Sequence, residues 1–156
     1  MKRIYLDDMR TPTEPGWIVV RTWDDFVDAV TEIGLDKIHI ISLDHDLGDT
    51  AMYEYRNNVS KHYKLDYDNI DEKTGYDCVK WLIGHFYNMY PERLEMPYTE
   101  RKRTEILFPK VVVHSANPIG SANMMGYINN FYKNEGQPQS CVRVEIEHTI
   151  HHEANN

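Results

Sequence analysis

The sequence contains few cysteines, no long apolar stretch and fewer bases than acids. Its 156 residues include only two cysteines, Cys78 and Cys141, which match neither a disulfide framework nor a zinc-ligand spacing. No run approaches the roughly 18 apolar residues of a membrane-spanning helix. The first residues, MKRIYLDD, lack the apolar region of a signal peptide. We therefore expect a protein of the reducing cytoplasm that has no membrane partner.

The charge balance restricts the class of nucleic acid that the protein could bind. The chain has 17 basic and 25 acidic residues and a net charge of −8. Sequence-independent binding to duplex DNA requires a basic face, so duplex DNA is not an expected partner. A phosphate ligand remains compatible, because a bound cation inverts the local field. The sequence does not indicate an oligomeric state.

Short apolar runs alternate with segments of helical periodicity. The runs predict strands at residues 3–6, 17–22, 37–43, 106–113 and 141–148, and the periodicity predicts helices at 22–34, at 74–90 and from Ser121 onward. Strands and helices that alternate in this way, with nearly continuous apolar strands, indicate an α/β fold whose mostly parallel sheet is covered on both faces. The length suits a single domain, which we place at residues 1–148.

Three segments lack this regular pattern. Residues 9–16, MRTPTEPG, contain two prolines and a glycine and cannot form a helix. Residues 49–73 and 91–106 are polar, and we interpret them as insertions, the first of which could act as a lid; residues 149–156 are expected to be a flexible tail. Four tyrosines of the first insertion could stack on a base, although a solvated loop is the favoured interpretation: Tyr53, Tyr55, Tyr63 and Tyr67.

Polar groups follow three of the predicted strands directly. The motifs are LDD, LDHD and VHSAN, and their candidate site residues are Asp7, Asp8, Asp44, His45, Asp46, His114, Ser115 and Asn117. Ligands of parallel α/β sheets bind beyond the carboxyl ends of the strands, so these side chains should converge on one rim if the strands are neighbours. Each motif alone could be a turn, a cap or a buried histidine. The joint pattern favours a functional rim.

The residue types on this rim suit metal and phosphate chemistry. Clustered carboxylates require a cation or a shared proton, and hard oxygen ligands favour Mg²⁺, Mn²⁺ or Ca²⁺. We therefore expect Asp7, Asp8 and Asp44 to bind Mg²⁺ or Mn²⁺, with the backbone carbonyl of Asp46 as a further ligand. His45 and His114 could exchange protons near neutral pH from opposite sides of a substrate. Ser115 and Asn117, at a helix N-terminus, could bind phosphate oxygens.

Two resemblances extend this interpretation. YLDD and the later LD resemble the metal-binding acids and the phosphoacceptor Asp44 of response-regulator receiver domains, but no lysine-proline follows the last strand and histidines accompany Asp44 and Ser115. Five blocks in order, LDDMRTPTEPGW, VRT, SLDHDLG, TGYDCVKWL and VHSANPIGSANM, resemble the cyclic-phosphate-processing receiver-like domain family of bacteria and phages, over residues 3–125.

This second resemblance implies both a fold and a set of site residues. The implied fold is a flavodoxin/receiver-like three-layer sandwich with a five-stranded sheet, in which a loop replaces the first helix. The implied catalytic residues are His45, His114 and Asp44, the metal ligands are Asp7, Asp8, Asp44 and Asp46, and the phosphate-binding residues are Arg10, Arg21, Thr74, Ser115 and Asn117. A guanidinium can bind two phosphate oxygens at once, which suits the two arginines to this role.

The leading hypothesis is a metal-dependent phosphoesterase that opens a cyclic phosphate, either a 2′,3′-cyclic phosphate RNA end or a cyclic nucleotide, in RNA processing. A second hypothesis is a receiver-like module that binds such a ligand without converting it. A third is a signalling receiver phosphorylated on Asp44, which the missing lysine disfavours. A phosphatase of the haloacid dehalogenase type also has an Asp-x-Asp motif, but its motif usually follows the first strand and LDHD follows the third.

Overall fold

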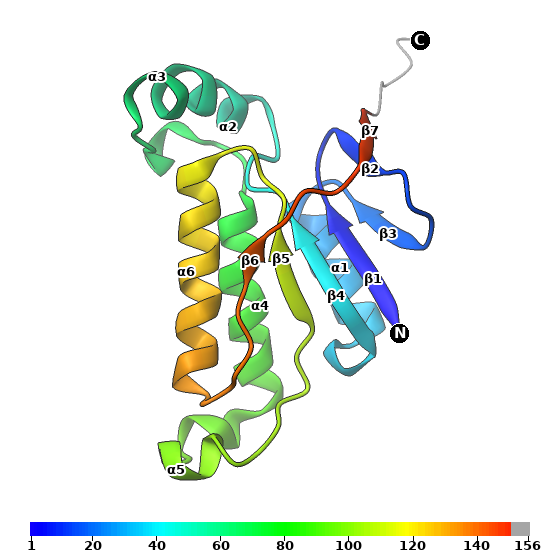
Figure 1. Ribbon diagram of the computed structural model, residues 1–156, viewed down its shortest axis with the longest axis vertical. Helices are drawn as coiled ribbons and strands as arrows, with labels where there is room; N and C mark the ends of the chain where they lie inside the picture. Colours follow the sequence, from blue (N-terminus) through cyan, green and yellow to red (C-terminus); the bar gives the residue numbers. More distant parts are fainter. Residues whose placement is uncertain (151–156) are drawn as a thin grey trace.

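Five parallel strands form the central sheet of the computed structural model, which describes residues 1–150. They are β1 (Lys2–Leu6), β3 (Trp17–Val20), β4 (Ile38–Leu43), β5 (Lys110–Val113) and β6 (Val142–Arg143), arranged in the order β3-β1-β4-β5-β6 (Figure 1). The predicted α/β fold with a five-stranded parallel sheet is confirmed. The last strand is shorter than expected, because only two residues of the alternating segment 141–148 pair with β5.

Three long helices cover one face of this sheet. They are α1 (Trp23–Ile33), α4 (Gly75–Met89) and α6 (Pro118–Asn134), and each connects two parallel strands of the sheet. All three connections are right-handed crossovers that run in the same direction across the sheet, so the three helices lie on the same face. Alternate strand residues such as Ile4, Ile41 and Val111 form the core with these helices. α6 starts at Pro118 rather than at Ser121, because Asn117 caps it by accepting the Gly120 N–H and proline suits the first helical position.

The opposite face of the sheet has no helix among residues 1–150. A loop replaces the first helix, as expected, and the segment that follows β6 crosses this face as an extended chain (Figure 1). The last described element is β7 (His148–Ile150), which pairs antiparallel with β2 (Arg10–Pro12). The three long helices thus lie on one face of the sheet, and the extended segment lies on the other. The first two residues of the expected tail are part of a ribbon, and residues 151–156 lie outside the described part of the chain.

The two polar insertions are folded into short helices. The first contains α2 (Asp49–Glu54), a π-helical turn η2 (Tyr55–Val59), α3 (Ser60–His62) and the 3₁₀ turn η3 (Tyr67–Asn69). The second contains the 3₁₀ turn η4 (Pro91–Leu94) and α5 (Tyr98–Arg101). Outside the insertions, one more 3₁₀ turn, η1 (Leu35–Lys37), precedes β4. In the first insertion, the buried carboxylate of Glu54 accepts hydrogen bonds from the side chains of Asn58 and Asn69 and from the Asp66 N–H. This internal bonding gives the insertion a defined shape.

A buried ion pair holds the second insertion against α6. The guanidinium of Arg93 contacts the Glu135 carboxylate at 2.6 Å, and Tyr87 donates a hydrogen bond to the same carboxylate. A buried carboxylate requires partners of this kind, since the loss of hydration is otherwise uncompensated. Among residues 1–150, no helix has the length and the apolar composition that crossing a membrane demands.

Candidate functional site

Three carboxylates meet at the carboxyl edge of the sheet. Asp7 and Asp8 follow β1, Asp44 follows β4, and these strands are neighbours whose last residues, Leu6 and Leu43, are paired. One carboxylate oxygen of each aspartate lies within 4.8 Å of the others. The structure thus brings together the three acids that the sequence predicts as metal ligands, because parallel pairing aligns the two strand ends.

A guanidinium lies against these acids. The Nε atom of Arg10 donates to Asp7 Oδ2 at 2.7 Å, and Nη2 is 3.5 Å from Asp44 Oδ2. Nη2 also reaches the His114 carbonyl oxygen at 3.4 Å. Arg10 is therefore an internal counter-charge that links the three strand ends, and it is positioned beside any group bound to the acids.

Burial and mutual repulsion perturb the acids differently. Burial, together with the charge of Asp7, raises the pKa of Asp44 to about 7 and that of Asp8 to about 6. Burial also acts against the charged form of Asp7, but hydrogen bonds from His114 and from the Arg10 and Met9 N–H groups outweigh it and lower the pKa of Asp7. Two of the three carboxylates are thus destabilised as anions, which is the electrostatic condition that a bound cation relieves.

His114 is buried next to the acids, and both nitrogens of its ring have hydrogen-bond partners. Its Nε2 atom lies 3.1 Å from Asp7 Oδ2 and its Nδ1 atom 2.7 Å from the Ser42 hydroxyl, while the ring stacks on Tyr5 with 4.2 Å between centroids. Burial lowers the pKa of His114, so the ring is neutral at pH 7. Because a carboxylate only accepts, Nε2 carries the hydrogen and Nδ1 accepts from Ser42. His114 therefore orients Asp7.

His45 is in an equivalent position beside Asp46. Its fully buried ring donates from Nδ1 to Asp46 Oδ1 at 2.7 Å, and Nε2 is 3.0 Å from the Tyr67 hydroxyl. The ring packs so closely on α6 that a Cβ at Gly120 would lie 2.3 Å from its Cγ. The arrangement differs from the expected pair of histidines facing each other across a substrate, because both nitrogens of each ring are already engaged.

Asp46 does not join the carboxylate cluster of the other three acids. Its Oδ1 accepts from His45 and, at 3.3 Å, from the side-chain amide of Asn117. Asn117 thereby joins the second acidic motif to the cap of α6. Asp46 still lines the same cavity as the other acids, but its carboxylate accepts hydrogen bonds from His45 and Asn117.

Three further residues predicted to bind phosphate make structural contacts. Arg21 donates to the carbonyl oxygens of Asp7 and Arg10 and to the Thr11 hydroxyl, so it braces the loop after β1. Thr74 forms a capping box with Asp77 at the start of α4. The Ser115 hydroxyl accepts the Asn117 N–H and contacts Asp44. Of the predicted phosphate ligands, Arg10 is the one that lines the cavity above the acids.

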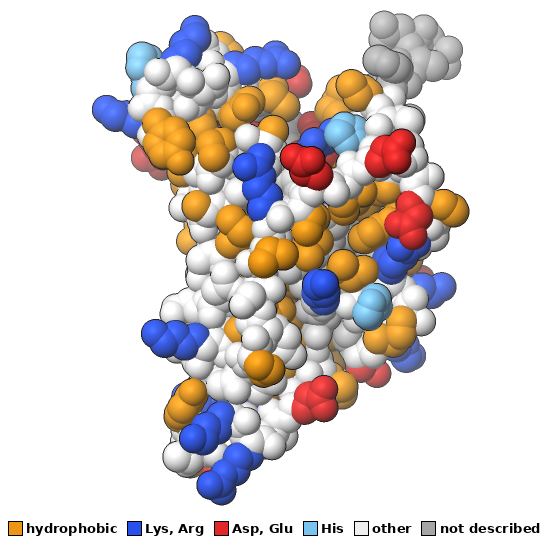
Figure 2. Space-filling model, viewed as in Figure 1, with side chains coloured by type: hydrophobic (Ala, Val, Ile, Leu, Met, Phe, Trp, Pro, Cys, Tyr) orange, Lys and Arg blue, Asp and Glu red, His pale blue; other side chains and the backbone are white. Residues whose placement is uncertain are grey.

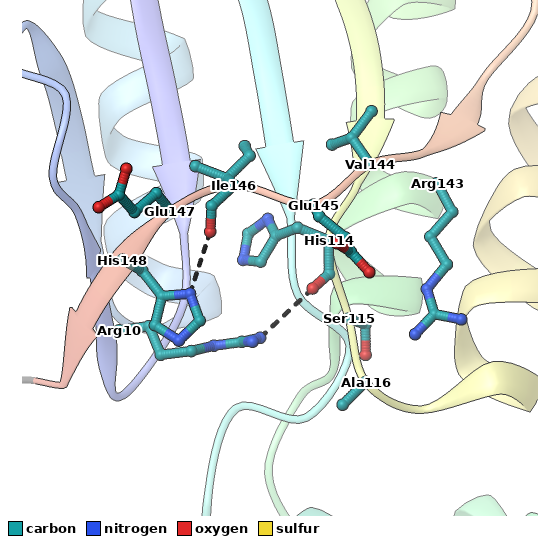
Figure 3. A pocket seen from close by; sticks show the side chains of 10 residues that line it. All are labelled: Arg10, His114, Ser115, Ala116, Arg143, Val144, Glu145, Ile146, Glu147 and His148. Atoms are coloured by element: carbon teal, nitrogen blue, oxygen red, sulfur yellow. Dashed lines mark hydrogen bonds between the residues drawn. The ribbon is translucent and has the colours of Figure 1, made fainter.

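Two cavities open at this edge of the sheet. The smaller, about 240 Å³, contains the acids Asp7, Asp8, Asp44 and Asp46 together with Arg10, and its other lining residues are Met9, Met52, Tyr55, Ala116 and Ile150. The larger, about 580 Å³, lies between Arg10, His114 and the extended chain 143–148 (Figure 3). We call the smaller one the acid cavity. The sequence indicates its acids but does not single out Met9, Met52 or Ile150, because no local pattern marks an apolar residue as a cavity wall.

The donor set fits a hard divalent cation. Three carboxylates offer oxygen atoms within 4.8 Å of one another beside an open cavity, and Mg²⁺ and Mn²⁺ prefer such ligands. Asp7, Asp8 and Asp44 are the residues that would hold the ion.

The sequence matches one known protein family over most of its length. A family model described as "Cyclic-phosphate processing Receiver domain" matches residues 2–130, which is more than half of the chain. The chain belongs to this family. The cyclic-phosphate processing receiver domain thus spans β1 to most of α6, including the acid cluster and the first insertion, while β6 and β7 lie beyond the matched residues. Neither the curated proteins nor the solved structures that were searched produced a match.

Proposed function

We propose that the protein is a Mg²⁺- or Mn²⁺-dependent phosphoesterase that opens a cyclic phosphate, either on an RNA end or in a cyclic nucleotide. The observation that carries this proposal is the cluster of three carboxylates within 4.8 Å, with the Arg10 guanidinium beside it, on the floor of a cavity. The description of the family supplies the substrate class. An acidic cluster of this kind repels a phosphate unless a cation lies between them, so metal dependence follows from the charges.

The residues of the cavity floor have distinct roles in this proposal. Asp7, Asp8 and Asp44 would hold the metal ion, which would supply Lewis-acid polarisation of the phosphoryl group and activation of a water molecule. Arg10 binds a non-bridging phosphate oxygen and compensates its charge, since its guanidinium is partly exposed and lines the acid cavity. Its two contacts with Asp7 and Asp44 hold the guanidinium in place before the substrate binds.

The histidines are positioning residues in this account. His114 holds Asp7 through Nε2–H, and His45 holds Asp46 through Nδ1–H. Hydrogen bonds to metal ligands typically contribute about 10- to 100-fold to metal affinity. His114→Ala should therefore weaken metal binding by about that factor and leave kcat largely intact at saturating metal, whereas removal of a general acid or base would lower kcat at every metal concentration.

A binding module without turnover is the second candidate, and one observation favours it. Both nitrogens of both histidines are engaged, so neither ring presents a free nitrogen for proton transfer in this arrangement. Such a module would retain the metal and the ligand in the same cavity. The two functions differ only in whether the ligand is recovered unchanged.

Phosphorus NMR separates the two functions. A 2′,3′-cyclic nucleotide is incubated with the protein and Mg²⁺ or Mn²⁺, alongside Asp44→Asn and the control Asp28→Asn, which alters an exposed acid on α1. We expect the cyclic resonance to convert to a monoester with the wild type and the control only. A ligand that binds in calorimetry but is recovered unchanged would establish the binding module, and conversion by Asp44→Asn at the wild-type rate would refute the assigned site.

A further inference from the structure

The acid cavity has a second surface that the proposed chemistry does not use. Four of its lining residues are large and apolar, and they come from three separate parts of the chain: Met9 after β1, Met52 and Tyr55 in the first insertion, and Ile150 in β7. Figure 1 shows the insertion and the β2–β7 ribbon on either side of the carboxyl ends of β1 and β4. In Figure 2, hydrophobic side chains flank the hollow between them. We call these four residues the apolar rim.

The apolar rim is placed by specific contacts. The antiparallel register of β2 and β7 pairs Ile150 with Arg10, the residue that contacts the acids. The buried Glu54 carboxylate organises the insertion immediately before Tyr55, and Glu72 accepts hydrogen bonds from Thr50 and from the Ala51 N–H just before Met52. Tyr55 also begins the π-helical turn, a type of irregularity that often occurs at functional sites.

Solvent exposure of these side chains requires an explanation. Met9 and Ile150 are 47% and 57% exposed, and Tyr55 and Met52 are only partly buried. Apolar side chains that gather around a polar floor are typical of ligand sites, in which a few polar groups orient a ligand and apolar groups cover the rest of it. A cavity of about 240 Å³ is smaller than the roughly 300–1,000 Å³ of sites for drug-sized ligands. Its occupant is therefore a single small unit rather than a dinucleotide.

We infer that the apolar rim binds the base of a nucleoside cyclic phosphate whose phosphate lies on the acid floor, with Tyr55 as the residue that stacks on the base and so favours base-bearing substrates. This inference rests on the proposed function and adds to it the residues that bind the base of the substrate. A base is flat, apolar on its faces and linked to the phosphate through a single ribose, and aromatic side chains bind any base by stacking. The structure also distinguishes the tyrosines of the insertion. Tyr53 is 69% exposed and does not line the acid cavity. The hydroxyl of Tyr67 is hydrogen-bonded to His45, and Tyr67 does not line the acid cavity either.

The test compares a substrate that has a base with one that lacks it. The probes are 2′,3′-cyclic AMP and glycerol 1,2-cyclic phosphate, which carry the same five-membered cyclic phosphate. The proteins are wild type, Tyr55→Leu, Tyr55→Phe and the matched control Tyr53→Leu. A stacked base contributes about 1–3 kcal/mol, which corresponds to roughly 5- to 150-fold in kcat/KM. Tyr55→Leu should lose about that factor on the nucleotide alone, while Tyr55→Phe and Tyr53→Leu should retain the wild-type ratio between the two substrates.

Several outcomes would overturn the inference. Equal losses on both substrates would assign Tyr55 a structural role, and an unchanged ratio in Tyr55→Leu would exclude stacking. If the wild type converts neither probe, the proposed function fails, and calorimetry with the same probes and variants tests the rim separately. Weaker binding of the nucleotide alone by Tyr55→Leu would then support the inference, whereas equal binding of both probes, or of neither, would overturn it. An oligonucleotide with a 2′,3′-cyclic phosphate end shows whether the natural ligand is an RNA end or a free nucleotide. If Tyr55→Leu weakens the reaction or binding of the oligonucleotide as much as that of the mononucleotide, the ligand is an RNA end. If it weakens only that of the mononucleotide, the ligand is a free nucleotide.

Discussion

Removing one negative charge from the acid cluster should stabilise the metal-free protein. The perturbation is Asp44→Asn. Asp44 is 6% exposed and its pKa is raised from 3.8 to about 7, by burial and then by the charge of Asp7. At about 1.4 kcal/mol per pH unit, keeping this carboxylate charged in the folded state costs roughly 4 kcal/mol. The buried amide that replaces it costs about 1–3 kcal/mol, so we expect a net gain of about 2 kcal/mol at pH 8.

The pH dependence follows from the direction of this shift. A carboxyl group whose pKa is higher in the folded than in the unfolded state binds more protons when folded, so the free energy of unfolding falls as the pH rises. For Asp44 the fall occurs between about pH 4, the unfolded value, and about pH 7, the folded value. Asp44→Asn should remove this part of the pH dependence and should be least distinguishable from the wild type below pH 4.

The assay is urea unfolding of chelator-treated protein at pH 4.5 and pH 8, repeated at pH 8 with added Mn²⁺. We expect Mn²⁺ to stabilise the wild type, by mass action, and to have little effect on Asp44→Asn. The control Asp28→Asn, an exposed substitution, should change stability by less than about 0.5 kcal/mol. A variant less stable than the wild type at pH 8 without metal, or one stabilised equally by Mn²⁺, would refute the reasoning about the acid cluster.

Three further predictions concern the surroundings of the site. Glu54→Gln should cost about 2 kcal/mol in urea unfolding, because hydrogen bonds to a charged acceptor are lost. The pKa of Glu54 is lowered from 4.5, so the difference from the wild type should persist above that pH and shrink in acid. Glu135→Gln leaves Arg93 without its buried counter-charge and should cost about 3 kcal/mol or more by the same assay. Gly120→Ala forces its methyl group against the His45 ring and should cost about 1–3 kcal/mol in urea unfolding, and an unchanged stability would contradict the packing.

The fold could be predicted because its signals are local. Residues 2–6, 38–43 and 110–113 are short apolar runs that lie at the centre of a parallel sheet, and such strands are apolar on both faces. Caps also act over a few residues, and Thr22 and Gly34 bound α1 within the helix predicted at residues 22–34. The predicted start of α6 was wrong by three residues. Ser121 resembles an N-cap, but Asn117 is the actual N-cap and Pro118 is the first residue of the helix.

The composition of the acid cluster was predictable for a related reason. Asp7, Asp8 and Asp44 each follow an apolar run directly, and parallel strands in one sheet carry such residues to one edge. The roles of the individual residues were not predictable in the same way. Arg21 matches a phosphate-binding position in the sequence, yet it braces the loop after β1 by donating to the carbonyl oxygen of Asp7. A hydrogen bond between a side chain and a distant backbone group leaves no pattern in either segment.

The sequence by itself determined the parallel α/β architecture, the family and the three acids of the floor, because periodicity, caps and strand-end motifs operate within a few residues. Only the tertiary structure decided how the two histidines are bonded, which tyrosine of the insertion faces the acids and that Ile150 reaches them from the other end of the chain. Those features depend on the register of β2 with β7 and on hydrogen bonds between segments far apart in sequence. The physical reason is that a cavity is formed by surfaces that meet only after folding, so its walls have no periodicity along the chain.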